Sequence, residues 1–553
     1  MLTVVAEEDL GGTVNIHEHD SLMFITEPDP KQVLPCRQNN LLAPIDCIEE
    51  IPDLRVVTET TDFFKKGYNL FPCHLYLCPQ SKEYFSNVAQ NISQKKSFVK
   101  RGDILYLLCF VLKYGCMSQS LARNTSFMTF ASIGQKILAF AYFTLIARMV
   151  GVENTGKYFF ALSFTTVFVV FIDLGFTNVF IREAAKTKER IQAYFSFILA
   201  IKGGLAILTY IATVICINLL GYPMDTRQLV YLSAVTMVFD TFHMTLYGVL
   251  RSLGELKYEA IGIVGTQFLT LILGTVFLLL HLPLIFLILA FTIPSACNVL
   301  FVSLILVKKF GIKIRPQWDT LTFKYLGRIV IPFAIAAVFA RIYSYADTLI
   351  LSKIMGETAV GWYSIPYKIT YAFQFIPLAL VAAIYPRFSE YYAEDREKLG
   401  RVFEYGMKYL FLVAFPIAVG IGVLAKDIIL FLYTPEYLPS VVPLQILIVG
   451  LIFSYASFPV GAFLNACNRQ VSQTVIVGIV MVLNIVCNLL FIPLYGVTGA
   501  AVAALIGNVL LTFLGLLIIP RIAEGFSFAS LLSNFLRIGL SAGVMGIVVV
   551  WLN

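Results

Sequence analysis

Apolar runs of about 20 residues, separated by short polar connections, recur from about residue 125 to the C-terminal end of the sequence. A helix of that length rises about 30 Å, which matches the hydrocarbon core of a bilayer. None of these runs alternates apolar and polar residues over a length that would predict a membrane barrel strand. The pattern therefore predicts an all-α, polytopic membrane protein.

Thirteen spans are expected, and their limits define the predicted organisation of the chain. They cover residues 125–149, 157–181, 191–219, 228–251, 259–281, 284–307, 327–352, 361–385, 404–432, 441–466, 472–494, 497–520 and 532–552. The expected parts are a first transmembrane bundle of six spans, a linker, a second bundle of six spans and an extra C-terminal span, over residues 117–307, 308–326, 327–520 and 521–553. An odd number of spans leaves open a fourteenth that this sequence lacks.

Residues 1–116 have mixed polarity, no clear period and three of the five histidines. We expect an N-terminal extension that is poorly ordered, or a start misassigned upstream of Met117. His17 and His19 resemble the His-x-His pair of metal-dependent hydrolase barrels, but the roughly 250 residues of strand–helix repeats that such a barrel needs do not follow. Neither a metal site nor a cofactor is expected.

The distribution of charge predicts the orientation of the spans. Only 14% of the residues are charged, against about 25% in soluble proteins. Lys and Arg gather in connections that follow even-numbered spans, namely 182–190, 308–328 and 387–408. The expected location is the cytoplasmic membrane. The positive-inside rule places these connections and the start of the first span on its cytoplasmic side. The net charge of +7 therefore reflects topology, and no nucleic-acid partner is expected.

Two connections on the opposite side form a repeat. The stretch Gly151-Val-Glu-Asn-Thr-Gly-Lys-Tyr158 differs from a Walker A loop only at its last residue. It follows a membrane helix instead of a strand, and a similar stretch, Gly356 to Tyr363, lies 205 residues later with Trp362 in place of the lysine. We therefore interpret the glycines as turn and packing residues rather than as a nucleotide loop, at positions Gly151, Gly156, Gly356 and Gly361. The same offset pairs Lys136 with Arg341, and it indicates two halves with parallel topology.

Four stretches carry a resemblance to a known family. LIARMVGVENTGKYFFALSF and FIDLGFTNVFIREAAK in the first half, with LYTPEYLPSVVPLQIL and PLYGVTGAAVAALIGN in the second, resemble the polysaccharide repeat-unit (O-antigen type) flippases of the multidrug/oligosaccharidyl-lipid/polysaccharide (MOP) exporter superfamily. The resemblance covers about residues 120–553. It implies two six-helix bundles around a central cavity, alternating access, and transport of a polyprenyl-(pyro)phosphate-linked oligosaccharide. A polysaccharide polymerase and glycosyltransferases are the protein partners to consider.

Ionisable residues inside spans are costly, so we expect them to face the protein interior and to serve function or helix pairing. With an anionic lipid head group as the implied substrate, the candidate binding residues are Arg341, Lys136, Lys202 and Lys368. The candidate ion-coupling residues are Asp240, His243 and Asp347, and Asp173 is a candidate structural salt bridge. The alternative left open is that the cations pair with Asp173, Asp240 or Asp347 and hold helices together.

Three other functions remain as alternatives. A multidrug/cation antiporter of the same superfamily needs mid-membrane carboxylates, whereas cations dominate here. A peptidoglycan lipid-precursor flippase also moves a lipid pyrophosphate and is harder to separate. An enzyme such as a membrane-anchored glycosyltransferase needs a carboxylate pair or metal motif in a soluble domain, and no such signature occurs in residues 1–116.

Overall fold

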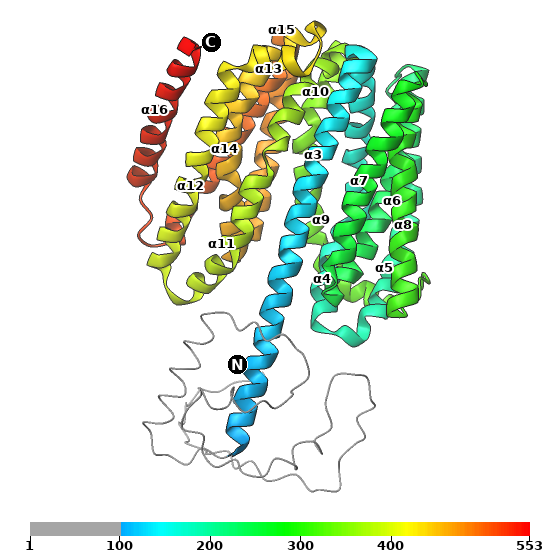
Figure 1. The fold of residues 1–553 in the computed structure, drawn as a ribbon, viewed down its shortest axis with the longest axis vertical. Coiled ribbons are helices and arrows are strands. Elements are labelled where there is room, and N and C mark those ends of the chain that lie inside the picture. The colour runs from blue at the N-terminus through cyan, green and yellow to red at the C-terminus, as the bar shows by residue number, and fades with distance from the viewer. Residues whose placement is uncertain (1–100, 553) are drawn as a thin grey trace, which may run out of the picture. The chain divides into compact units, whose positions relative to one another are not determined.

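The computed structural model describes residues 101–552, which form an all-helical protein without β-strands in that part of the chain (Figure 1). The helices of the first half are α3 (Arg101–Asp173), α4 (Phe176–Lys186), η2 (Lys188–Arg190), α5 (Ile191–Leu219), α6 (Met224–Leu253), α7 (Leu256–Leu279) and α8 (Ile285–Phe310). Of the expected N-terminal extension, residues 101–116 are the start of α3, and the remainder lies outside the described residues.

The second half begins with α9 after a connection without helix. Its elements are α9 (Thr320–Met355), α10 (Glu357–Ala372), α11 (Phe375–Glu394), α12 (Arg396–Val423), α13 (Ala425–Leu432), η3 (Pro435–Ser440), α14 (Val441–Ala466), α15 (Gln470–Leu516), η4 (Ile519–Arg521) and α16 (Phe528–Leu552). In Figure 1, α12, α14 and α16 lie on one side of α3, and α6, α7 and α8 lie on the other.

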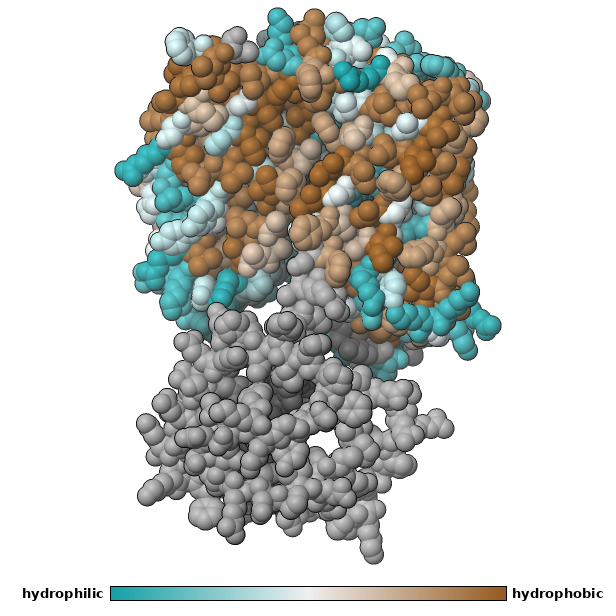
Figure 2. Space-filling view, viewed as in Figure 1, coloured by the Kyte–Doolittle hydropathy of each residue, from teal (hydrophilic) through white to brown (hydrophobic). Residues whose placement is uncertain are grey.

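Eleven helical ranges of the described chain are long and apolar enough to cross a membrane. Two of them, 127–173 and 470–521, each hold two of the expected spans, because the chain reverses inside them at Gly151 and Gly496. Phe143 and Phe159 show the first reversal: a straight helix would separate them by about 24 Å, yet their ring centroids are 6.1 Å apart. Hydrophobic side chains cover most of the middle of the visible face, and hydrophilic ones gather toward its two ends (Figure 2).

Two spans are interrupted at similar places in the two halves. The second span breaks between α3 and α4 at Leu174 and Gly175, which both have positive φ. The eighth span breaks between α10 and α11 at Phe373, whose freed carbonyl accepts a hydrogen bond from the Tyr455 hydroxyl at 2.7 Å. In transporters built from repeats, interrupted helices at equivalent positions commonly lie near the substrate site.

The glycines of the repeated stretch pack the two halves against each other. Gly151 (φ 78°, ψ 172°) and Gly356 (φ 82°, ψ −176°) share a backbone conformation open almost solely to glycine. A Cβ atom on Gly156 would lie 1.8 Å from the carbonyl oxygen of Glu357, and one on Gly361 would lie 2.2 Å from that of Val152. Gly156 and Gly361 are equivalent positions of the repeat, and so are Val152 and Glu357, so each contact is the counterpart of the other. These contacts form a seam between the halves that has approximate two-fold symmetry.

Polar contacts between the halves follow the same symmetry. Arg148 donates a hydrogen bond to the Phe431 carbonyl at 3.0 Å, at the end of α13. Its repeat equivalent Lys353 donates to the Leu220 carbonyl at 2.7 Å, at the end of α5. The hydroxyl of Tyr437 adds a hydrogen bond to the carbonyl of Ala147 at 3.0 Å. We call this end of the bundle, which carries Gly151 and Gly356, the turn end, and the opposite end, which carries the α8–α9 connection, the linker end.

The buried cores show where the halves meet and where they do not. One core joins both halves near the turn end, with members such as Tyr158 and Tyr363. A second core lies wholly within the second half, and a third holds first-half residues with only Leu326 and Val330 from the start of α9. The halves therefore share a core at the turn end, whereas toward the linker end only the start of α9 joins the core of the first half.

Candidate functional site

Three of the four predicted substrate cations have no carboxylate partner among the described residues. Lys136 on α3 and Lys368 on α10 are half-buried, and Arg341 on α9 is exposed. Within residues 101–552, none of the three forms an ion pair. The alternative that they pair with an aspartate therefore does not describe this structure for Lys136, Arg341 or Lys368.

Aromatic rings contact two of these cations, Lys136 and Lys368, and the third, Arg341, acts electrostatically on one of the same rings. The Lys136 ammonium lies 4.4 Å from the centroid of the Tyr371 ring, and Arg341 is within electrostatic range of the same tyrosine. The Lys368 ammonium lies 5.2 Å from the ring of Phe143. Lys136 and Lys368 also act on each other electrostatically. The site thus combines cations from α3, α9 and α10, which belong to both halves.

Lys202 has a different environment from the other predicted substrate cations. It is fully buried on α5, where its ammonium forms an ion pair with Asp173 and hydrogen bonds to the hydroxyls of Thr177 at 2.7 Å and Thr245 at 2.8 Å. These contacts use all three of its N–H groups. Lys202 is therefore unavailable to a substrate in this conformation, and it holds α5 to α6 and to the break between α3 and α4. Asp173, which was predicted to form a structural salt bridge, is the carboxylate partner of Lys202 here.

Replacement of Lys202 by methionine is expected to destabilise the protein rather than weaken substrate binding alone. Loss of one partner from a buried pair leaves the other charge uncompensated, at a cost of about 3–5 kcal/mol. The measurement is the melting temperature of the detergent-solubilised protein, with the double variant Lys202→Met, Asp173→Asn expected to recover part of the loss. An unchanged melting temperature together with lost substrate binding would instead show that Lys202 takes part in substrate binding.

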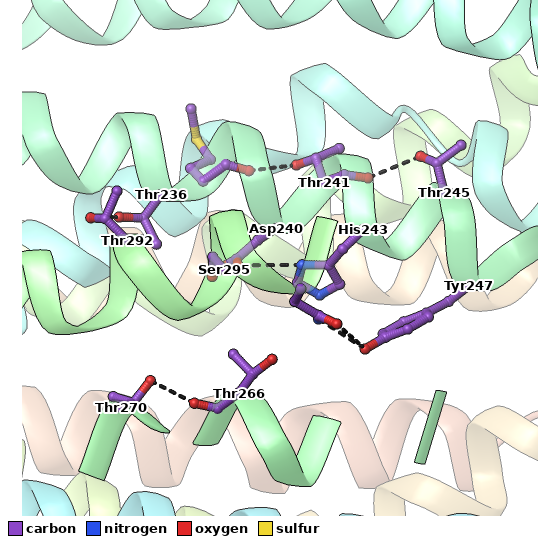
Figure 3. A network of polar contacts seen from close by, with 12 residues as sticks. Thr236, Asp240, Thr241, His243, Thr245, Tyr247, Thr266, Thr270, Thr292 and Ser295 are labelled. Atoms are coloured by element: carbon purple, nitrogen blue, oxygen red, sulfur yellow. Dashed lines mark hydrogen bonds and ion pairs between the residues drawn. The ribbon is translucent and has the colours of Figure 1, made fainter. Parts of the chain in front are cut away.

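The Asp240–His243 pair lies in a polar network between α6 and α8 (Figure 3). The Oδ1 atom of Asp240 accepts a hydrogen bond from Ser295 at 2.5 Å and faces the Nδ1 atom of His243 at 3.6 Å. The His243 side chain is 14% exposed, and its ring packs on the edge of Tyr247. That tyrosine exchanges hydrogen bonds with Asn298 on α8 at 2.8 and 3.0 Å. The two helices are thus joined by hydrogen bonds through Ser295 and Asn298, next to the titratable groups of Asp240 and His243.

Asp347, the third predicted coupling residue, is buried on α9 and forms no ion pair with any residue between 101 and 552. It accepts hydrogen bonds from the Tyr363 hydroxyl and from the Thr348 amide. The position equivalent to Asp347 in the first half is Tyr142, so only the second half carries a buried carboxylate here. Asp347 and Asp240 lie on helices of different halves, and they belong to separate hydrogen-bonded groups.

Two features of the site were not predicted from the sequence. The first is the row of tyrosines along α10, Tyr363, Tyr367 and Tyr371, for which the four-residue spacing was an available signal. The second is the ion pair between Arg251 and the fully buried Glu259, which joins the end of α6 to the start of α7. The sequence predicts that the ends of the two helices lie close together, but it does not predict that Glu259 is buried.

The fold and site define a multi-pass, all-α membrane protein of the transporter class. The family model described as "Polysaccharide biosynthesis protein" matches residues 121–392, and the model "MatE" matches residues 332–490. These matches support the resemblance that the four stretches carry, to the polysaccharide flippases of the MOP superfamily. The expected all-α polytopic fold is confirmed.

Two named proteins are similar to this chain in sequence. The chain is 22% identical over 394 residues to the capsular polysaccharide biosynthesis protein CapF of Staphylococcus aureus, with 70% of this chain and 96% of CapF covered. It is 29% identical over 212 residues to the protein named "Probable flippase AglR" of Haloferax volcanii. That alignment covers 37% of this chain and 43% of AglR, so it spans less than half of that relative.

Solved structures share the fold. The lipid II flippase MurJ in an inward closed conformation has a TM-score of 0.64 at 17% identity, with 77% of this chain and 92% of MurJ covered. A multidrug resistance MATE transporter of the MOP superfamily in an inward-facing conformation has a TM-score of 0.60 at 15% identity, with 70% and 94% covered. At these identities the likeness concerns the fold alone.

Proposed function

We propose that the protein is a flippase that moves polyprenyl-(pyro)phosphate-linked oligosaccharide units across the cytoplasmic membrane by alternating access. The observation that carries the proposal is the group of Lys136, Arg341 and Lys368, cations from both halves without carboxylate partners in the described chain. A phosphate that leaves water needs cations to replace its hydration, and an arginine can offer it two parallel hydrogen bonds. A site for cationic drugs would instead need free carboxylates here.

Orientation completes the transport proposal. With the positive-inside rule, the linker end faces the cytoplasm and the turn end faces outward. The shared core and the glycine seam then close the protein to the outside, and the separate cores allow entry of a lipid-linked substrate from the cytoplasmic leaflet. Glycosyltransferases would supply this substrate and a polysaccharide polymerase would consume it.

Complementation tests the substrate class. Expression of the protein in a strain that lacks its own repeat-unit flippase is expected to restore surface glycan. Expression in a strain depleted of its peptidoglycan-precursor flippase is not expected to restore growth. The opposite pair of results, with the protein present in the membrane of both strains, would favour the peptidoglycan-precursor alternative.

We also propose that Asp240 with His243, and separately Asp347, couple transport to an ion. Protonation of His243 would let its Nδ1–H donate to the Asp240 carboxylate and turn their 3.6 Å contact into a hydrogen-bonded ion pair. Arg251 and Glu259 lie near this network, and Glu259 acts electrostatically on His243. The two residues form an ion pair, so their charges neutralise each other. Asp347 is buried and has no cation partner in the described part of the chain, so a bound proton or cation would offset its charge.

In vesicles that contain the purified protein, an imposed pH gradient is expected to change the rate of substrate translocation. Asp240→Asn should remove most of this response while leaving translocation without a gradient, because the anion-binding cations are unchanged. Asp347→Asn is tested with the same pH gradient and with a sodium gradient. Comparison of the two variants shows whether Asp240 with His243, or Asp347, carries the response. A wild-type protein that responds to neither gradient would contradict both coupling roles.

A further inference from the structure

The two lysines of the candidate site rest on one continuous aromatic surface. Phe143 and Phe159 of α3 meet with ring centroids 6.1 Å apart, and Phe159 meets Tyr367 of α10 at 5.5 Å. Tyr367 and Tyr371 then stack almost in parallel, with 6.0 Å between centroids and 8° between planes. This aromatic surface, made of Phe143, Phe159, Tyr367 and Tyr371, crosses from the first half to the second.

Each lysine ammonium lies over a different part of the aromatic surface. Lys136 stands 4.4 Å from the Tyr371 centroid, and Lys368 lies between Phe143 and Phe159 at 5.2 and 5.4 Å. The negative face of an aromatic ring attracts a cation without supplying a full negative charge. A carboxylate in the same place would neutralise the lysine and compete with the phosphate of a substrate.

We propose that the aromatic surface is a positioning device of the substrate site, which holds Lys136 and Lys368 ready for a phosphate or pyrophosphate group. The inference rests on the proposed function and adds residues to it. Neither ammonium group has an ion-pair partner within residues 101–552, and the rings offset part of the cost of these charges inside the membrane. The rings also hold two like charges from opposite halves in one region. An arriving anion then relieves the repulsion between the ammonium groups and accepts hydrogen bonds from their N–H groups without first displacing a carboxylate.

Tyr371 is the residue on which the inference can be tested with little risk to folding. Its side chain is 43% exposed, and its hydroxyl has no hydrogen bond in the described structure, so Tyr371→Phe keeps the ring face and is a matched control. Tyr371→Leu removes the ring face but keeps an apolar side chain. The probe is inorganic pyrophosphate, whose binding to the purified full chain is measured by calorimetry, with a lipid pyrophosphate in a second series.

Tyr371→Leu is expected to weaken pyrophosphate binding about 2- to 30-fold, the range of one cation–π contact. Tyr371→Phe should bind within about twofold of the wild type, since the ring face that attracts the ammonium is retained. In a Lys136→Gln background, Tyr371→Leu should have no further effect, because the ring acts through the lysine. A purely structural role of Tyr371 would instead lower binding to the same extent in both backgrounds.

The outcomes separate the inference from the function on which it rests. A wild type that binds pyrophosphate while Tyr371→Leu binds equally well overturns the aromatic positioning role and leaves the anion site intact. Equal losses in Tyr371→Phe and Tyr371→Leu also overturn it, since the hydroxyl would then be responsible. A wild type that binds neither inorganic nor lipid pyrophosphate overturns the anion site and the inference together.

Discussion

Gly361→Ala is expected to abolish most glycan export while the protein remains in the membrane at normal amounts. The added Cβ would lie 2.2 Å from the Val152 carbonyl oxygen, a backbone atom that cannot move without its helix. Overpacking of this kind costs about 1–3 kcal/mol, which shifts an equilibrium by about 5- to 150-fold. The closed state at the turn end bears this cost, because Gly361 meets Val152 only when the halves touch.

The conformational effect of Gly361→Ala can be measured directly. A cysteine introduced at Thr155, which is fully buried at the seam, should be inaccessible to a membrane-impermeant maleimide in the wild type. In the Gly361→Ala background it should react, since the turn end opens more often. Gly203→Ala is the matched control, because no described atom outside the local backbone of α5 lies within 4 Å of its added Cβ. Normal export and unchanged labelling in Gly361→Ala would show that the seam is not a moving contact.

Arg341→Gln carries the second large expected effect. A hydrogen bond to a charged group contributes about 1.5–3 kcal/mol, so the variant should bind lipid pyrophosphate about 10- to 150-fold more weakly. Its stability should be unchanged, because Arg341 is exposed and has no ion pair among the described residues. The affinity of Arg341→Lys for lipid pyrophosphate should lie between those of the wild type and Arg341→Gln, because lysine keeps the charge but loses the planar donor pair.

A control for Arg341→Gln is available on α16. Arg537 is also an exposed arginine on a membrane helix, but it lies outside the group of Lys136, Arg341 and Lys368. Arg537→Gln should bind and export as the wild type does. If Arg341→Gln inserts normally and supports full export, Arg341 has no part in substrate binding.

Much of the fold followed from hydrophobic pattern alone. The predicted limits 191–219 and 441–466 are those of α5 and α14, where polar or glycine- and proline-containing connections end the apolar runs on both sides. The interruption at Leu174 was not predicted, because a positive φ on leucine depends on tertiary contacts that a sequence pattern does not contain. The start of α3 at Arg101 was also missed, since the residues before 117 show no helical period.

The candidate site was predictable in part, and the reason differs between residues. The repeat offset pairs Lys136 with Arg341, and it made both cations candidates for one site because duplicated halves are expected to preserve depth in the membrane. The offset gave no help for Lys202, whose partner Asp173 lies on another helix. Spacing along one helix revealed that Asp240 and His243 share a face, but Ser295 and Asn298 come from α8 and required the packing.

The central claim is that the protein moves a lipid through its phosphate, and translocation in reconstituted vesicles tests it most directly. A polyprenyl-pyrophosphate-linked oligosaccharide placed in one leaflet is expected to become accessible to a lectin at the other leaflet in the presence of the wild-type protein. Arg341→Gln should slow this strongly, Arg537→Gln should not, and a neutral glycolipid with the same sugar should stay in its leaflet. Equal translocation of the neutral glycolipid, or an unchanged rate in Arg341→Gln, would contradict the account.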